Sequence, residues 1–167
     1  MKTCIYISGP PCVGKSTVAA AVSRSASAVA YIHGDEYWST YPGRSFAERV
    51  SKTNQDVLAA LRDSASSNVI CEWVPCRGVF VEELYDICIT QKRLLLHVIL
   101  TAPISVLRSR KRRRDGDEDI GPEVVPDTNK QNPYSCLIFD TTKKATSFIA
   151  DEIAQWILSL KTWSALE

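Results

Sequence analysis

Short apolar runs alternate along the chain with longer stretches in which apolar residues recur every three or four positions. The short runs predict buried strands, and the longer stretches predict amphipathic helices. The predicted strands span residues 4–8, 28–33, 69–73, 94–100 and 136–140. The predicted helices span residues 15–27, 46–64, 79–89, a stretch opening at Pro103, and 145–160. Between the second strand and the second helix, the polar and aromatic residues 36–45 predict a turn.

This alternation predicts an α/β fold in which helices cover both faces of a parallel sheet. The near-continuous apolar strands agree with that prediction, since such strands are buried on both faces. In parallel sheets, ligands bind outside the carboxyl ends of the strands. Asp35, Glu72 and Thr101 fall at or just past the ends of predicted strands, so we expect them at one edge of the sheet.

The segment 9–17 reads GPPCVGKST and matches the phosphate-binding loop pattern G-x-x-x-x-G-K-[ST]. It lies between a predicted strand and a predicted helix, as that loop requires. Gly9 and Gly14 allow a tight turn and a close approach to phosphate. The two prolines after Gly9 have no N–H group, so the phosphate-facing donors must come from about Cys12 onward.

The predicted nucleotide contacts within this loop are Gly9, Cys12, Val13, Gly14, Lys15, Ser16 and Thr17. Lys15 is expected to reach the β- and γ-phosphates, and Ser16 to ligate magnesium. Cys12 has two interpretations. It is either a tolerated loop residue or a thiol whose pKa the helix N-terminus lowers, which would make it oxidisable.

Two carboxylates at the expected edge are candidates for chemistry. Asp35 would accept a proton from a substrate hydroxyl that attacks the γ-phosphate, or it would cap a helix. Glu72 would serve magnesium or the substrate, or it would pair with an arginine as an edge carboxylate.

The basic run Arg108–Arg114 has three interpretations: a solvated helix face, a nucleic-acid patch, or a lid over ATP. The acidic residues that follow it disfavour the patch. Arg110 and Arg114 are four residues apart and share a helical face, so we expect them to close over the nucleotide as catalytic residues. Arg108 and Arg112 lie on another face and are expected to be solvated. The lid would span about residues 103–133.

Aromatic and basic residues follow the second and third predicted strands. Aromatic rings beside arginines suit a flat or anionic acceptor, although core packing and surface charge explain the same residues. The predicted acceptor-binding residues are Asp35, Tyr37, Trp38, Arg44, Glu72 and Arg77.

Composition narrows the class of protein. The 167 residues predict one domain over 1–167, with 45% hydrophobic and 23% charged residues. The net charge of +1 gives no overall attraction to nucleic acid, and no apolar run approaches the length of a membrane span. The start of the chain lacks the pattern of a signal peptide, so we expect a cytoplasmic protein. Six cysteines without a C-x-x-C pair, and only two histidines, disfavour a zinc site.

The chain resembles the small P-loop kinases that act on metabolites, a group that includes gluconate kinase, shikimate kinase, chloramphenicol phosphotransferase and the zeta-toxin-like proteins. The resemblance rests on residues 9–17, Asp35, the pattern from Val106 to Arg114, and residues 140–142. It implies a three-layer fold with strand order 2-3-1-4-5, and it implies ATP and magnesium as cofactors. It also implies that the turn after the fifth strand, near Thr142, lies against the adenine.

The expected function is therefore transfer of the ATP γ-phosphate to a small hydroxyl- or phosphate-bearing molecule, by a monomer or homodimer. No single member of the group matches, because residues 36–38 do not continue the gluconate kinase pattern and Tyr37 replaces the second aspartate of shikimate kinases. A regulatory GTPase or ATPase is an alternative, but the guanine-reading motif N-K-x-D is missing. A nucleic-acid end kinase that uses the arginine run is another.

Overall fold

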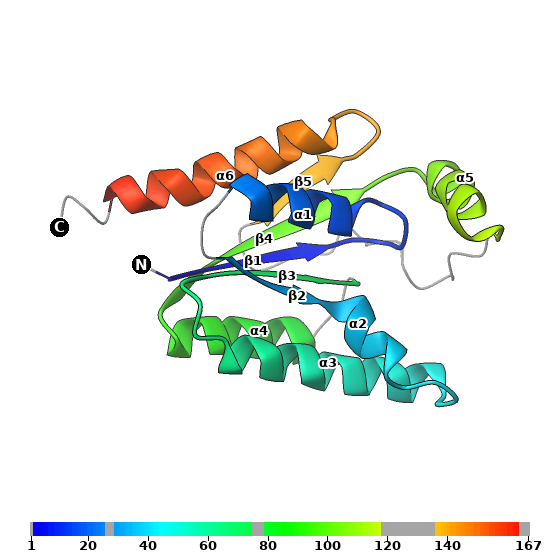
Figure 1. The fold of residues 1–167 in the computed structure, drawn as a ribbon, viewed down its shortest axis with the longest axis horizontal. Coiled ribbons are helices and arrows are strands. Elements are labelled where there is room, and N and C mark those ends of the chain that lie inside the picture. The colour runs from blue at the N-terminus through cyan, green and yellow to red at the C-terminus, as the bar shows by residue number, and fades with distance from the viewer. Residues whose placement is uncertain (1, 26–28, 75–78, 118–135, 164–167) are drawn as a thin grey trace.

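The computed structural model describes residues 2–25, 29–74, 79–117 and 136–163. Its centre is a five-stranded parallel sheet with the order β2-β3-β1-β4-β5 (Figure 1). The strands are β1 (Lys2–Ser8), β2 (Val29–His33), β3 (Asn68–Trp73), β4 (Arg93–Thr101) and β5 (Cys136–Asp140). The predicted α/β class and the predicted strand order are confirmed.

Helices cover both faces of this sheet (Figure 1). One face carries α1 (Lys15–Ser25) and α6 (Thr146–Trp163), and the other carries α3 (Phe46–Asp63) and α4 (Val79–Thr90). At the carboxyl edge lie α2 (Gly34–Ser39) and α5 (Ile104–Asp115). Within the described ranges, no helix has the length and apolarity that a membrane span needs.

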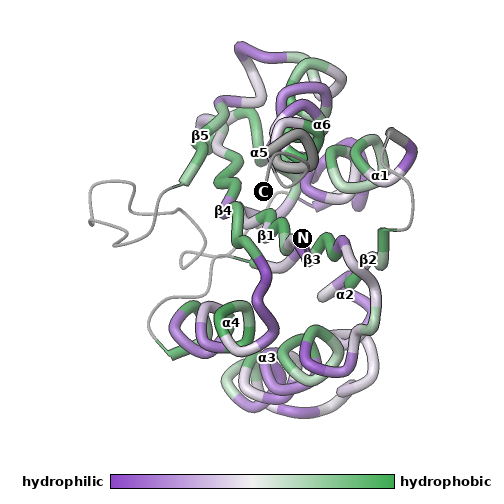
Figure 2. Tube along the Cα trace, turned by 90° about the vertical axis from the view of Figure 1, so that its left-hand side faces the viewer, coloured by the Kyte–Doolittle hydropathy of each residue, from purple (hydrophilic) through white to green (hydrophobic). Residues whose placement is uncertain are grey.

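The alternation of side chains along β1 builds two separate hydrophobic cores. Ile5 and Ile7 point to the side of α1 and α6, whereas Cys4 and Tyr6 point to the side of α3 and α4. Figure 2 shows hydrophobic residues concentrated along the central strands, with hydrophilic residues on the outer helix surfaces. Burial on both faces thus explains why the strands read as nearly continuous apolar runs.

The turn predicted over residues 36–45 is only partly correct, because α2 occupies its first part. Gly34 begins this short helix against the ring of Trp73: a Cβ there would lie 2.1 Å from Trp73 Cε3. The acidic side chains of Asp35 and Glu36 stand in the first helical turn, where the positive end of the helix dipole stabilises them. The loop proper ends at Ser45, which caps α3 in a reciprocal capping box with Glu48.

Candidate active site

The phosphate-binding loop joins β1 to α1 at the carboxyl edge. A Cβ at Gly9 would lie 2.6 Å from the backbone oxygen of Leu100, so only glycine fits there. Gly14 and Cys12 both have positive φ, of 106° and 62°. The Cys12 conformation is uncommon for a residue with a side chain, and it turns the loop toward the first N–H groups of α1. The backbone is therefore shaped as an anion cradle.

Lys15 is folded back onto this loop. Its ammonium group donates to the carbonyl oxygens of Gly9 and Pro10, at 3.1 and 3.2 Å. Burial lowers the pKa of Lys15, while the carboxylates of Glu72 and Asp35 oppose that shift. The lysine is thus held inside the loop, with two carboxylates close enough to influence its charge.

Glu72, at the end of β3, connects the phosphate loop to β2. Its side chain is only 2% exposed. The Ser16 hydroxyl donates to Glu72 Oε1 at 2.8 Å, and His33 Nε2 lies 2.7 Å from the same oxygen. Two side chains from different elements therefore converge on one buried carboxylate oxygen.

The residues predicted for magnesium fit that ion. Oε2 of Glu72 is buried and has no hydrogen-bond partner among the described residues, and the Ser16 hydroxyl lies beside the same carboxylate. An oxygen-rich site of this kind suits magnesium, which retains waters and binds few protein ligands. No group of three histidine, cysteine or acidic side chains gathers into a metal site in the described part of the chain.

Asp35 and Tyr31 complete this cluster. The Asp35 carboxylate is 67% exposed and lies 3.7 Å from His33 Nε2. Tyr31 stacks on the His33 ring with centroids 5.6 Å apart. Partial burial, followed by nearby Glu72, raises the pKa of Tyr31. Asp35 is therefore the solvent-facing member of a polar cluster that begins at the phosphate loop.

Arg110 joins α5 to the loop and to the turn after β5. Its guanidinium donates to the carbonyl oxygens of Cys12 and Val13 at 3.5 and 3.4 Å. It also donates to the hydroxyl and the carbonyl oxygen of Thr141, at 2.9 and 3.2 Å. A single planar cation thus bridges the two segments predicted to hold the phosphates and the adenine.

Arg114 lies one turn further along α5 and faces solvent more. Its guanidinium forms a bidentate ion pair with the carboxylate of Asp115, with N–O distances of 2.7 and 2.8 Å. This pairing lowers the pKa of Asp115 to about 2. Asp115 is also the main cause of a raised pKa of Arg114, to which Cys12 and Asp35 add. In this structure the Arg114 guanidinium is thus held by the neighbouring Asp115.

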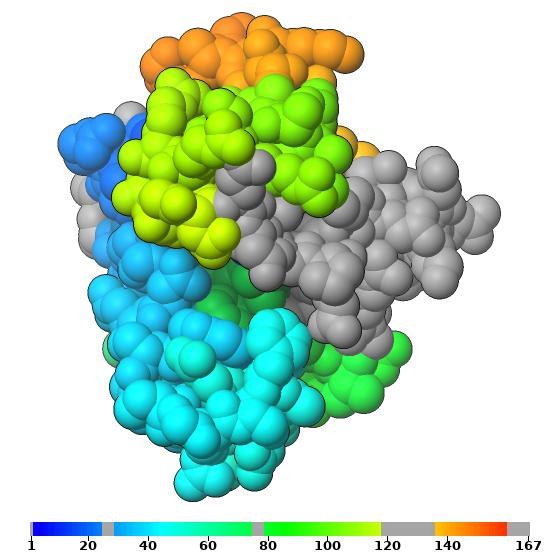
Figure 3. Space-filling model, turned by 90° about the vertical axis from the view of Figure 1, so that its right-hand side faces the viewer, coloured from blue at the N-terminus to red at the C-terminus, as the bar shows by residue number. Residues whose placement is uncertain are grey.

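Thr142, predicted beside the adenine, is tied into the turn after β5. Its backbone N–H and its hydroxyl both donate to Asp140 Oδ1, at 2.9 and 2.6 Å. The adjacent Thr141, which the sequence patterns did not single out, is the residue that contacts Arg110. Figure 3 shows a hollow at this edge, between α5 on one side and α2 and α3 on the other.

The residues predicted for the acceptor occupy different surroundings. Tyr37 and Trp38, which belong to α2, are partly buried and pack against the core on the α3 and α4 side of the sheet. Arg49 lies over the Trp38 ring, 3.9 Å from its centroid. The Arg44 side chain is 53% exposed and lies 3.9 Å from a Glu48 oxygen. Arg77 lies outside the described residues, as does the part of the predicted lid beyond residue 117.

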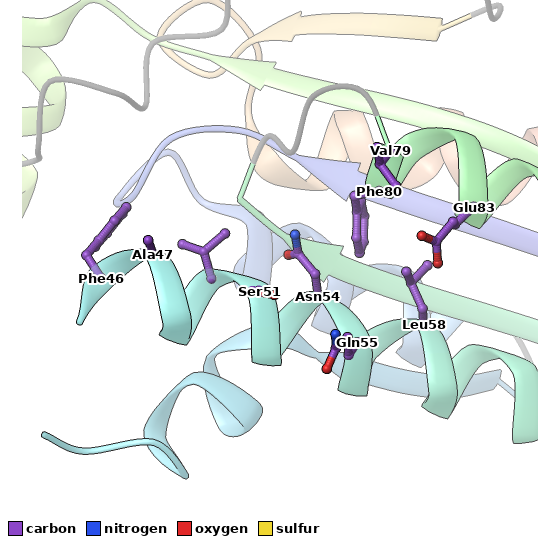
Figure 4. Close-up of a pocket in the computed structure, with 10 residues that line it drawn as sticks. Phe46, Ala47, Ser51, Asn54, Gln55, Leu58, Val79, Phe80 and Glu83 are labelled. Atoms are coloured by element: carbon purple, nitrogen blue, oxygen red, sulfur yellow. The ribbon is translucent and has the colours of Figure 1, made fainter. Parts of the chain in front are cut away.

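A groove of about 610 Å³ lies beside this edge, between α3 and α4 (Figure 4). Its lining residues are Phe46, Ala47, Val50, Ser51, Asn54, Gln55, Leu58, Val79, Phe80 and Glu83. The indole N–H of Trp73 donates to Asn54 Oδ1 at 2.8 Å. Because Trp73 follows Glu72 in β3, this bond connects the groove wall to the polar cluster.

His33 is the main site residue that the sequence patterns did not indicate. Its position as the last residue of β2 was the available signal, because that rule had already selected Asp35 and Glu72. Tyr31 stands two residues earlier and contacts His33 through ring stacking rather than through a motif.

Comparisons with known proteins agree with this arrangement. No curated protein matches the sequence. The fold is similar to that of a gluconokinase from Sinorhizobium meliloti 1021, with TM-score 0.68, 18% identity, and coverage of 95% of this chain and 93% of that chain. A shikimate kinase from Acinetobacter baumannii gives TM-score 0.62 and 19% identity, covering 96% of each chain.

A third structure, the APS kinase of Mycobacterium tuberculosis, gives TM-score 0.65 and 17% identity, covering 93% of this chain and 97% of that chain. These likenesses confirm the expected P-loop kinase fold. A family model described as an AAA domain matches residues 5–129, a span that includes the phosphate loop, Asp35, Glu72 and Arg110. Because this match extends over most of the sequence, the chain belongs to that AAA domain family.

Proposed function

We propose that the protein is an ATP- and magnesium-dependent phosphotransferase that acts on a small molecule. The observation that carries this proposal is a continuous set of contacts from the phosphate loop to Asp35. Ser16 donates to Glu72 at 2.8 Å, Glu72 lies 2.7 Å from His33, and His33 lies 3.7 Å from Asp35. A simple nucleotide switch has no need for a solvent-facing carboxylate joined to its phosphate loop in this way.

Each group has a role in the proposed reaction. The loop N–H groups and Lys15 hold the β- and γ-phosphates. Asp35 accepts the proton of the acceptor hydroxyl while that oxygen bonds to the γ-phosphorus, and the bond to the β–γ bridging oxygen breaks. Arg110 and Arg114 offset the charge that develops on the transferring group. Magnesium, held by Ser16 and Glu72, would neutralise charge on the phosphates.

The acceptor would enter through the hollow between α5 and α2, with its body in the groove between α3 and α4. The Trp73–Asn54 hydrogen bond supports this placement, because it joins the groove wall to the strand that carries Glu72. Tyr37, Trp38, Arg44 and Arg77 stay predictions as acceptor contacts, and so do the cytoplasmic location and the monomeric or homodimeric state.

Following ADP release from ATP across a panel of hydroxyl compounds tests the proposal. The wild-type protein is expected to release ADP with at least one acceptor and to prefer ATP to GTP. Lys15→Ala should abolish turnover, whereas Asp35→Asn should keep ATP binding and lose transfer. Full transfer by Asp35→Asn would refute the assigned base. A preference for GTP without any acceptor-dependent turnover would instead favour a regulatory NTPase.

A further inference from the structure

We propose that the groove between α3 and α4 binds an uncharged molecule that combines an apolar body with hydroxyl groups and carries no phosphate or carboxylate. This inference deepens the proposed function and rests on it for one point, that the bound molecule is the phosphoryl acceptor. The chemistry of the groove walls carries the rest.

Apolar side chains form much of the groove. Phe46 and Val79 are 59% and 67% exposed, although both are large apolar residues that proteins usually cover. They come from the two helices that line the groove: Phe46 stands at the start of α3, and Val79 stands at the start of α4 with Phe80 beside it (Figure 4). The volume of about 610 Å³ suits a small organic ligand. An occupant with an apolar body would remove both exposed side chains from water.

Polar groups in the groove suit hydroxyls. Ser51, Asn54 and Gln55 line it along α3. The Trp73 indole N–H donates to the Asn54 oxygen at 2.8 Å, which fixes the orientation of that amide at the groove wall. Neutral donors and acceptors of this kind match the mixed hydrogen bonding of alcohols.

The charge of the described groove walls disfavours an anionic occupant. Among the described lining residues, Glu83 is the one charged side chain, and none is lysine or arginine. Proteins bind phosphate and carboxylate with such cations, usually arginine. Two arginines near the start of α3 are engaged elsewhere: Arg44, in the loop before α3, lies beside Glu48, and Arg49, on α3, lies over Trp38. Against the described lining, an anion would lose water and face Glu83 without a compensating cation.

Trp73 connects the groove wall to the edge of the sheet that carries the phosphate loop. The indole N–H of Trp73 donates to Asn54. The backbone of Gly34 packs so closely against the same ring that a Cβ would lie 2.1 Å from Cε3. Gly34 immediately precedes Asp35 in α2. One aromatic residue thus supports both the groove wall and the start of the helix that carries the proposed base.

Three sugars that differ in one feature at a time test this inference. Phenyl β-D-glucoside is neutral with an apolar ring, phenyl β-D-glucuronide has a carboxylate in place of the C6 hydroxymethyl group, and glucose lacks the ring. Each is titrated into ¹⁵N-labelled protein while the side-chain amide signals of Asn54 and Gln55 are followed by NMR. The glucoside should bind at least about tenfold more tightly than either of the others, which corresponds to about 1.4 kcal/mol. Equal or tighter binding of the glucuronide or of glucose would overturn the inference, as would unchanged amide signals with all three.

Neighbouring acids on α4 provide a matched pair of variants. Glu83 lines the groove, whereas Glu82, which belongs to the same helix, is absent from its lining. Glu83→Gln should reduce the ratio of glucoside affinity to glucuronide affinity about threefold, because it removes a charge that repels the carboxylate. Glu82→Gln should leave this affinity ratio unchanged. The same response in both variants would show that the groove charge does not set the selectivity.

The titration needs no ATP, so its outcome is separate from that of the proposed function. Binding of MgATP is measured on the same samples. If the wild-type protein does not bind MgATP, the kinase proposal is refuted, but the selectivity of the groove is unaffected. Normal MgATP binding with the wrong order of the three sugars would refute only the groove inference.

Discussion

His33 Nε2 lies 2.7 Å from Glu72 Oε1, the same oxygen that accepts the hydrogen bond of the Ser16 hydroxyl. Glu72 is almost fully buried, and its second oxygen has no partner among the described residues. The contact with His33 therefore restricts how the carboxylate can rotate. We infer that His33 is a positioning residue, which aims the second oxygen at the place where magnesium and its waters would lie.

Replacing His33 should weaken the magnesium-dependent part of ATP binding. In His33→Ala, the gain in ATP affinity on adding magnesium should fall about tenfold, the usual cost of losing a partner behind a metal ligand. ATP affinity without magnesium should change little, because the loop and Lys15 remain. His33→Gln should restore part of the gain, since its amide can place a nitrogen against the same carboxylate oxygen. Titration of a fluorescent ATP analogue, with and without magnesium, measures both affinities.

Glu36→Gln is the control for this experiment. Glu36 lies 3.7 Å from the other ring nitrogen of His33 and is 76% exposed, so its substitution should leave both affinities unchanged. If His33→Ala lowers the two affinities equally, His33 has a general structural role and the positioning role is wrong.

Arg110 should matter for nucleotide binding far more than Arg108 of the same helix. Arg110→Ala removes the cation that bridges the loop carbonyls and Thr141, so ATP affinity should fall at least about tenfold. Arg110→Lys should recover little, because a lysine cannot bond to both segments with a planar fork. Isothermal titration of ATP measures the change.

Arg108→Ala is the matched control, since Arg108 is exposed on another face of the same helix. It should bind ATP like the wild-type protein. If Arg108→Ala and Arg110→Ala lower the ATP affinity equally, the overall charge of α5 supports ATP binding, rather than the contacts of one guanidinium.

The regular elements were predictable because their signals are local. The β5 bounds match those predicted, and α3 ends one residue before its predicted end, since apolar periodicity and a capping box mark these elements directly. The short α2 was missed because no side-chain pattern indicates it. Its start depends on Gly34 fitting against Trp73, a contact between residues far apart in the sequence.

The candidate site was predictable only where a motif or a strand end marks a residue. The loop residues and Asp35 follow from such signals. The link from Ser16 through Glu72 to His33 depends on the sheet order, which places β3 between β1 and β2. Likewise, the sequence alone could not distinguish Thr141 from Thr142, because the choice depends on where the Arg110 side chain reaches.

Gly34 offers a test of the contact that positions α2. Gly34→Ala would place a Cβ against the Trp73 ring, so it should lower the free energy of unfolding by about 2 kcal/mol or more. Gly43→Ala is a useful comparison: Gly43 has φ of 80°, but a Cβ there would meet nothing within 4 Å, so only backbone strain of about 1 kcal/mol is expected. Urea unfolding measures both. A smaller loss for Gly34→Ala than for Gly43→Ala would contradict the packing account.

Stability should depend on pH through His97. This residue is 6% exposed, its Nε2 lies 2.8 Å from the Ser8 hydroxyl, and burial lowers its pKa to about 4. Because the unfolded chain has an ordinary histidine pKa of about 6.5, unfolding takes up a proton between these two values. The stabilisation is therefore complete above about pH 6.5 and is lost as the pH falls toward 4, by at most about 3 kcal/mol.

The His97→Gln variant separates this effect from the general acid sensitivity of the protein. Glutamine keeps a polar group near Ser8 but does not titrate, so its stability should fall less than that of the wild-type protein over the same pH range. Urea unfolding at several pH values between about 4 and 7.5 gives both curves. Parallel curves would mean that His97 titrates normally in the folded protein. If the two stability curves converge at low pH, the proton is taken up by His97. This residue contacts Ser8, the last residue of β1 before the phosphate loop.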